Sequence, residues 1–269
     1  MNEIGISVIE YLTMGTAATG ILWLLARRRR AQIAVMAKKP LWVTWGAELF
    51  AVFALVLGGR VALADWPNVP SGSMEPTLRV GDYLLVNKLA YGPRLPFTNT
   101  AIELGQPQRG DVVVFRFPLD VSVLYVKRLI GLPGDVVAYD RGVVSINGEP
   151  FHAAQDAGYA GRKAEDNGQV FVREGAAGRE RVIKLDAKHP GAFVTPEAWV
   201  AAWPDACQVA ASDAWRCKVP PGKYLMMGDN RDNSADSRVW GFLDHREVYG
   251  KAVRVLVNFS DLKRAFMPL

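Results

Sequence analysis

Two serines, Ser71 and Ser73, flank Gly72 just after a long apolar segment. In an extended backbone, residues two apart project to the same side, so both hydroxyls are expected to point into one cavity. A serine hydroxyl becomes a nucleophile once a base removes its proton. Taken alone, Ser-Gly-Ser is more typical of a polar turn, so the chemistry depends on whether a base exists elsewhere.

Lys127 is the candidate base. A lysine accepts a proton only when neutral, which requires its pKa to fall from about 10.4. Burial lowers a lysine pKa because it disfavours the ammonium. Residues 121–130 read as a mostly buried strand, with Val126 beside Lys127. The adjacent Arg128 stays charged and faces the opposite way on a strand. Without the serines, this Lys-Arg pair would be typical of an exposed strand.

Three segments together carry a family resemblance. Residues 71–78 read SGSMEPTL, residues 125–135 read YVKRLIGLPGD, and residues 228–238 read GDNRDNSADSR. In this order and spacing, the chain resembles the bacterial type I signal peptidases, which are membrane-anchored serine proteases that use a lysine in place of a histidine. The resemblance extends from the N-terminal apolar segments to Phe259.

The resemblance implies a role for each matching residue. Ser73 would attack the scissile carbonyl, and Lys127 would act as general base. The backbone N–H of Ser73 and the hydroxyl of Ser71 would hold the oxyanion. Ser234 would orient the lysine. A structural salt bridge between Asp236 and Arg238 would support that loop.

The resemblance also implies the substrate. Type I signal peptidases cut exported preproteins after small residues at the first and third positions before the bond. A tight apolar pocket favours small side chains because it excludes long or charged ones. The residues matching the pocket are Val69, Pro70, Met74, Leu78, Leu84, Tyr125 and Val126.

The first 65 residues are membrane-like. We expect two transmembrane anchors, at residues 1–26 and 41–65, each long enough to span a bilayer. Residues 27–40 between them carry six basic residues and no acid, which predicts a cytoplasmic loop. The rest would then lie outside the inner membrane of a bacterium, with the lipid bilayer, preproteins and the export translocon as partners. Glu10 and Arg60 would fall in the outer part of the bilayer, where they either pair or Arg60 snorkels outward.

The remaining chain predicts a mainly β fold. Strands at short intervals with almost no helical periodicity indicate a partly closed antiparallel architecture. The resemblance implies the same, a coiled antiparallel β-sheet catalytic core with a smaller inserted β region. We expect the core to comprise residues 66–151 and 217–269. The insertion would occupy residues 152–216, where the sequence is polar and rich in Gly and Ala.

Several classes of site and ligand are disfavoured. The net charge of +5 is concentrated in the basic block, so it gives little support for nucleic-acid binding. Cys207 and Cys217 are close in sequence, and in an oxidising compartment they favour a disulfide over a metal site. No cofactor or metal is expected. The three histidines, His152, His189 and His245, lie outside the motifs.

Two alternatives stay open at this point. Other Ser/Lys proteases, such as self-cleaving repressors and conjugation-pilus peptidases, use similar dyads, although the apolar segments and the chain length disfavour both. A non-catalytic, membrane-anchored β module acting as a secretion scaffold is the second alternative. Ser73, Lys127 and Ser234 are all present, so nothing in the sequence indicates a lost site.

Overall fold

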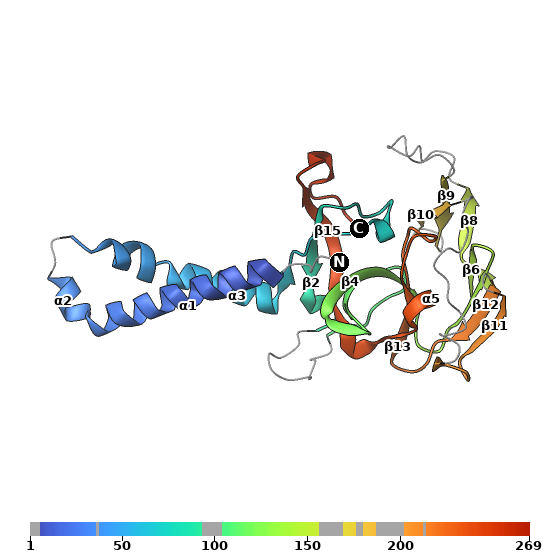
Figure 1. Ribbon diagram of the computed structural model, residues 1–269, viewed down its shortest axis with the longest axis horizontal. Helices are drawn as coiled ribbons and strands as arrows, with labels where there is room; N and C mark the ends of the chain where they lie inside the picture. The colour runs from blue at the N-terminus through green and yellow to red at the C-terminus, as the bar shows by residue number, and fades with distance from the viewer. Residues whose placement is uncertain are drawn as a thin grey trace.

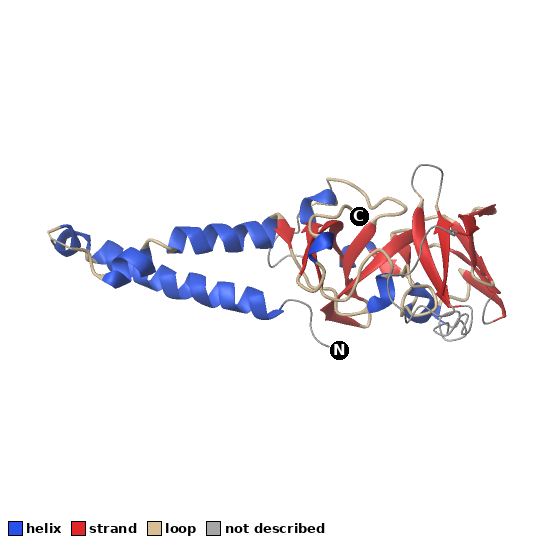
Figure 2. Ribbon diagram, turned by 90° about the horizontal axis from the view of Figure 1, so that it is seen from above, coloured by secondary structure: helices blue, strands red, loops and turns tan. Residues whose placement is uncertain are grey.

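The protein, seen here as a computed structural model, divides by secondary structure into two parts (Figures 1 and 2). Helices project at one end, and antiparallel β-sheets form the other. The structure describes residues 6–35, 38–92, 104–155, 169–175, 180–186, 202–211 and 214–269. The mainly β, antiparallel fold predicted from the sequence is confirmed.

The helical part is a hairpin whose two arms lie side by side in both views (Figures 1 and 2). Glycines allow the arms to approach closely, since a Cβ added to Gly15 would lie 3.1 Å from Phe53 and one on Gly20 would lie 3.1 Å from Phe50. The helical segments are α1 (Ile6–Arg28), α2 (Arg30–Ala34), the π-helical η1 (Trp42–Ala47) and α3 (Phe50–Ala62).

One helix among the described residues, Trp42–Arg60, is long and apolar enough to cross a membrane. Large apolar side chains are exposed on both arms of the hairpin, among them Met14, Ile21 and Leu55. The structure thus supports one candidate membrane span, at Trp42–Arg60. The other anchor, expected at residues 1–26, stays a prediction.

The structure does not test the predicted pair between Glu10 and Arg60, because the side chain of Glu10 lies outside the described ones. Arg60 itself is paired within the β part of the chain, because its Nε lies 2.9 Å from Oδ1 of Asp65.

The main sheet has seven strands in the order β1-β2-β15-β3-β4-β13-β14, and neighbours pair antiparallel. Its strands are rich in Val, Leu and Met, as expected for a pleated surface with buried side chains. Their bounds are β1 (Ala64–Asp65), β2 (Asp82–Asn87), β3 (Val112–Phe117), β4 (Asp120–Gly131), β13 (Lys223–Met227), β14 (Leu243–Asp244) and β15 (Val248–Asn258).

A second sheet of five strands follows the order β11-β12-β5-β6-β7. The Asn147-Gly148 turn joins β6 to β7, and both residues have positive φ, as a tight hairpin requires. The strands are β5 (Val136–Asp140), β6 (Val143–Ile146), β7 (Glu149–Pro150), β11 (Cys207–Ala211) and β12 (Ala214–Lys218). Residues 136–150 therefore share a sheet with residues 207–218, and the division between sheets falls near Gly131 rather than at residue 152.

A third sheet, in the order β10-β9-β8, completes the described strands. It comprises β8 (His152–Gln155), β9 (Gln169–Glu174) and β10 (Arg181–Asp186). Figure 1 shows these strands beside the second sheet, at the end of the molecule far from the helices. Much of the predicted insertion, including residues 187–201, lies outside the described residues.

The first two sheets share one apolar core. Ile130 and Leu225 from the main sheet pack with Val137 and Trp215 from the second. Gly131 stands at their junction, where a Cβ would lie 2.8 Å from Val137 and 2.9 Å from Val219. Because those distances are below normal contact, only glycine fits there without a shift of its neighbours.

Cys207 and Cys217 form a disulfide between neighbouring strands β11 and β12. Both side chains are buried in the shared core. A bridge across this short loop stabilises the fold mainly by restricting the unfolded chain.

Replacing both cysteines by alanine is expected to lower the free energy of unfolding by about 3 kcal/mol. Thermal unfolding with and without a reductant measures this. The reductant should lower the midpoint of the wild type and leave the double variant unchanged. An equal effect on both proteins would show that the disulfide contributes nothing.

Candidate active site

The serine segment, residues 71–78, changes from an extended to a helical backbone after Ser71. Ser71 is extended, with φ −132° and ψ 156°, but Gly72 to Met74 form the 3-10 helix η2. The argument that an extended backbone places both hydroxyls on one side therefore does not apply to this segment. The two hydroxyls nevertheless meet, since Oγ of Ser71 lies 3.4 Å from Oγ of Ser73. A tight helical turn brings them together in place of the strand pleat.

Lys127 projects from β4 onto the serine. Its Nζ lies 2.7 Å from Oγ of Ser73 and 3.1 Å from the carbonyl oxygen of Val126. Lys127 is 4% exposed and Ser73 is 9% exposed. Strand β4 is held centrally between β3 and β13, which fixes the lysine from both sides. The two residues thus meet in a site almost closed to water.

Burial lowers the pKa of Lys127 to about 8, against the attraction of Asp236 and Asp229, which acts to raise it. Removal of water disfavours the ammonium more than the two carboxylates stabilise it. With that pKa, about a tenth of the lysine is neutral at pH 7, and the neutral fraction rises to half near pH 8.

Asp236 and Arg238 form a buried ion pair at the start of α5 (Ser237–Trp240). Nε of Arg238 donates to Oδ1 at 2.9 Å, and Nη2 donates to Oδ2 at 2.8 Å. The backbone N–H of Gly228 also donates to Asp236, at 2.9 Å. Although burial acts to raise it, the pair with Arg238 holds the pKa of Asp236 below its ordinary value. This carboxylate is therefore satisfied without the lysine.

Ser234 is buried, and its Oγ has no hydrogen-bond partner among the described residues. The hydrogen bond to Lys127 that the resemblance implies is not formed in this structure. Ser234 still belongs to the site, because a Cβ added to Gly228 would collide with both its Oγ and the carbonyl oxygen of Ser73. Gly228 thus lets the loop carrying Ser234 pack directly on the serine segment.

Asn230, which sequence reasoning missed, ties this loop to the serine backbone. Its N–H donates to the carbonyl of Ser73 at 3.1 Å. Its Nδ2 donates to the carbonyl of Gly72 at 3.0 Å. Two bonds from one residue fix the turn that presents the Ser73 hydroxyl. The Gly-Asp-Asn-Arg sequence offered a signal only through the family resemblance.

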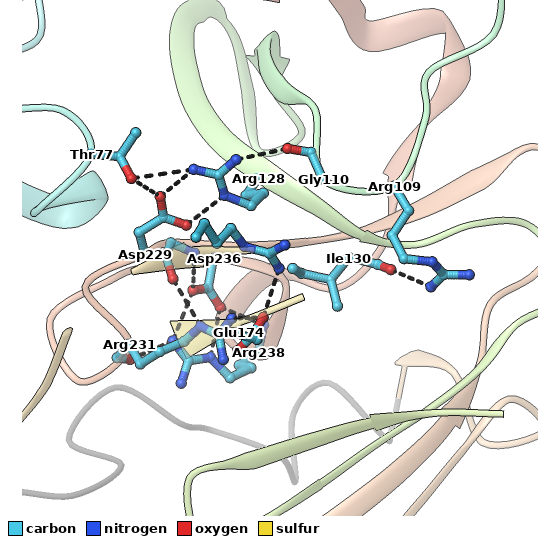
Figure 3. Close-up of polar contacts among 12 residues, drawn as sticks. Thr77, Arg109, Gly110, Arg128, Ile130, Glu174, Asp229, Arg231, Asp236 and Arg238 are labelled. Carbon is cyan, nitrogen blue, oxygen red and sulfur yellow. Dashed lines mark hydrogen bonds and ion pairs between the residues drawn. The ribbon is translucent and has the colours of Figure 1, made fainter. Parts of the chain in front are cut away.

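Arg128 follows Lys127 on β4 and so faces the opposite side of the strand, where it binds Asp229 (Figure 3). Its Nε donates to Oδ1 at 2.8 Å, and its Nη1 donates to the carbonyl of Gly110 at 2.7 Å. Thr77 completes the group, with its hydroxyl 2.6 Å from Oδ2 of Asp229. The two adjacent residues on β4 therefore act on opposite sides of the strand. Lys127 contacts Ser73, and Arg128 holds the loop that begins at Gly228 through Asp229.

A second ion network links the same loop to the third sheet (Figure 3). Glu174, 1% exposed at the end of β9, pairs with both Arg231 and Arg181. Nε of Arg231 donates to the carbonyl of Gly228 at 3.1 Å. Backbone bonds join β10 to the loop, since Lys184 donates to Asp229 and accepts from Arg231. The inserted strands therefore brace the loop that packs on the serine.

The seven predicted pocket residues divide into two groups. Pro70 is exposed and Tyr125 is half-buried. The others belong to one buried apolar cluster: Val69, Met74, Leu78, Leu84 and Val126. A cavity of about 480 Å³ lies elsewhere, on the Arg128 side, and neither Ser73 nor Lys127 lines it. Among the described residues, no group of His, Cys, Asp and Glu could hold a metal ion.

Comparison with known proteins decides the family. The family model described as signal peptidase, peptidase S26, matches residues 42–257. This chain belongs to that family. Membership makes it a serine endopeptidase that removes signal peptides from preproteins.

Two relatives match this chain along nearly their whole length. A signal peptidase I of Pseudomonas aeruginosa is 35% identical over 97% of this chain and 94% of its own. One of Pseudomonas fluorescens is 37% identical over 96% and 94%. A crystal structure of a signal peptidase I from Enterococcus faecalis is 27% identical and covers 55% of this chain and 98% of its own, at a TM-score of 0.31.

Gly228→Ala is expected to lower kcat by about a hundredfold, because a displacement near 1 Å in reacting groups has that effect. The added Cβ would lie 2.6 Å from Cβ of Ser234 and would also push on the carbonyl of Ser73. Cleavage of a preprotein with an Ala-x-Ala site measures it. Gly58→Ala is the matched control, since nothing lies within 4 Å of its added Cβ. Equal activity of the two variants would contradict the tight packing of the loop on the serine.

Proposed function

We propose that Ser73 is the nucleophile of this peptidase and that neutral Lys127 is its general base. The observation that carries the proposal is the 2.7 Å approach of Nζ to Oγ in a site where Lys127 is 4% exposed. Nζ contacts no carboxylate within salt-bridge distance among the described residues, so its lone pair is directed to the serine when the lysine is neutral.

The proposed reaction runs in two stages. Lys127 takes the Ser73 proton as Oγ attacks the scissile carbonyl carbon, and the lysine then protonates the leaving amine. The C–N bond breaks and an ester to Ser73 remains. Lys127 next removes a proton from water, whose oxygen attacks the ester, and the proton passes to Oγ. Serine and neutral lysine are both regenerated.

The Ser71 hydroxyl and the backbone N–H of Ser73 are proposed to hold the oxyanion. Ser71 is exposed and its Oγ approaches Oγ of Ser73, so it faces the place where the carbonyl oxygen would arrive. Exposed Pro70 and half-buried Tyr125 would meet the small side chains before the bond, with the buried cluster forming the wall behind them.

The membrane arrangement is also a proposal. Trp42–Arg60 would span the inner membrane of a bacterium, and α1 would span it in the opposite direction. The basic loop at residues 27–40 would stay cytoplasmic. The catalytic core, with its inserted strands, would lie on the outer face. Sharing the bilayer with the signal helix of a preprotein raises the effective substrate concentration, and the translocon would deliver that substrate.

Ser71→Ala is expected to lower kcat by roughly 10²–10³, as the loss of one oxyanion donor does. Ser73→Ala should show no turnover, because the nucleophile is gone. Burst and steady-state cleavage of the same preprotein separate the two effects. Full activity of Ser71→Ala would remove Ser71 from the proposed oxyanion site.

The pH dependence of kcat/KM follows from the lowered pKa of Lys127. Only the neutral lysine can accept a proton, so the rate should rise with pH and reach half its plateau near the folded-state pKa of about 8. A histidine base would produce its rise near 6.5 instead. Cleavage of a short peptide across pH measures this. A plateau already reached at pH 7 would contradict a lysine of that pKa as the base.

Chemical rebuilding of the base tests its identity. In a protein with Cys207 and Cys217 replaced, Lys127→Cys should be inactive, and alkylation with a two-carbon amine should restore activity with a shifted pH profile. Lys218→Cys, on an exposed position of β12, is the matched control and should be active before and after alkylation. No recovery in a folded, fully alkylated Lys127→Cys protein would count against lysine as the base.

A further inference from the structure

A buried polar cluster lies where α3 meets the main sheet. Arg60 is 2% exposed and Asp65 is 3% exposed, and their ion pair measures 2.9 Å. The hydroxyl of Tyr249 donates to Oδ2 of Asp65 at 2.6 Å. Nζ of Lys88 lies 3.8 Å from Oδ2 and donates to the carbonyl of Arg60 at 3.0 Å. We call these four residues the anchor joint.

Aromatic rings close the anchor joint on two sides. The Arg60 guanidinium lies 4.6 Å from the ring centre of Trp66, and Lys88 Nζ lies 4.5 Å from that of Tyr249. Burial, followed by the charge of Asp65, raises the pKa of Tyr249, so its hydroxyl keeps its proton and stays a donor. Any arrangement that separates one partner from this cluster would leave a buried charge uncompensated. The four side chains of the anchor joint are therefore held in a single arrangement.

The chain between the anchor joint and Ser73 is also held throughout. Backbone bonds tie it to β2 and the turn that precedes β2. Lys88 donates to the carbonyl of Leu63 at 3.1 Å, Leu84 donates to Pro67 at 2.9 Å, and Val69 donates to Asp82 at 2.8 Å. Strand β1 pairs with the end of β2 between these points. The helix therefore continues into the catalytic core with no free linker.

We propose that the anchor joint is a positioning device that fixes the height of Ser73 above the membrane end of α3, and so selects which bond of a membrane-tethered preprotein is cut. The inference rests on the proposed function, in which Trp42–Arg60 and the signal helix share one bilayer. An extended substrate rises about 3.3 Å per residue. A rigid joint thus converts a fixed height into a preferred number of residues between the signal helix and the cleaved bond.

The test changes the height without touching the site. Four polar, helix-forming residues inserted between Gly59 and Arg60 add about 6 Å of helix, which corresponds to about two residues of extended substrate. Full-length enzyme in lipid vesicles is given preproteins whose cleavage site stands at increasing distances from the apolar segment of the signal. The optimum should shift by about two residues towards the longer spacing.

The same insertion between Lys39 and Pro40, in the basic loop, is the matched control and should leave the optimum in place. A short soluble peptide, cleaved by the same proteins in detergent, reports the chemistry alone. Peptide cleavage that is unchanged in the first insertion, with no shift of the optimum in vesicles, would overturn the anchor joint as a positioning device. Failure of the wild type to cleave the peptide would contradict the proposed function instead.

Variants that weaken the anchor joint provide a second, independent test of the proposal. Arg60→Gln combined with Asp65→Asn removes both charges with little change of shape, and Tyr249→Phe removes one donor. Each should broaden the range of accepted spacings at least twofold, while kcat/KM on the peptide stays within about twofold of the wild type. An unchanged spacing profile in Tyr249→Phe and in the charge-free pair would also overturn the proposal. A merely structural role would instead lower both activities together.

Discussion

The site depends on burying the amine of Lys127 without placing a carboxylate in contact with it. Lys127 is 4% exposed, and among the described residues the atoms within hydrogen-bond distance of its Nζ are the Ser73 hydroxyl and a backbone carbonyl. A carboxylate in contact would raise the pKa of the lysine and hold it charged. Asp229 and Asp236 are near enough to act on that pKa. Each must therefore be neutralised by something other than the lysine.

Arginines perform that neutralisation. Asp229 binds Arg128, and Asp236 binds Arg238, each through two nitrogens. An arginine stays charged when buried, so it pairs permanently where a lysine would titrate. Buried pairs of this kind contribute little net stability and are costly to break singly. Their effect here is geometric as well as electrostatic, because the same bonds hold the loop from Gly228 against the serine.

The strands of the core were largely predictable, since their apolar runs are long and uninterrupted. Residues 112–117 and 248–258, for example, are apolar runs that form strands over their whole length. The loop from Gly228 to Arg238 was not predictable from pattern, because its polar residues read as a solvated turn. It is buried only because arginines and backbone groups from other segments satisfy its charges. The grouping of β5 to β7 with β11 and β12 depended on long-range pairing, which local sequence does not reveal.

The same constraint explains how Lys127, proposed above as the base, serves without an orienting acid. A histidine has two ring nitrogens, so a histidine base needs a third group to fix its tautomer, and a buried carboxylate commonly does so. Lysine has one side-chain nitrogen, and its position here follows from strand β4 and from its contacts with Ser73 and the carbonyl of Val126. What it requires is a lowered pKa, which burial supplies. An acid in contact with Lys127 would raise that pKa again, and in this fold both nearby acids, Asp229 and Asp236, bind arginines instead.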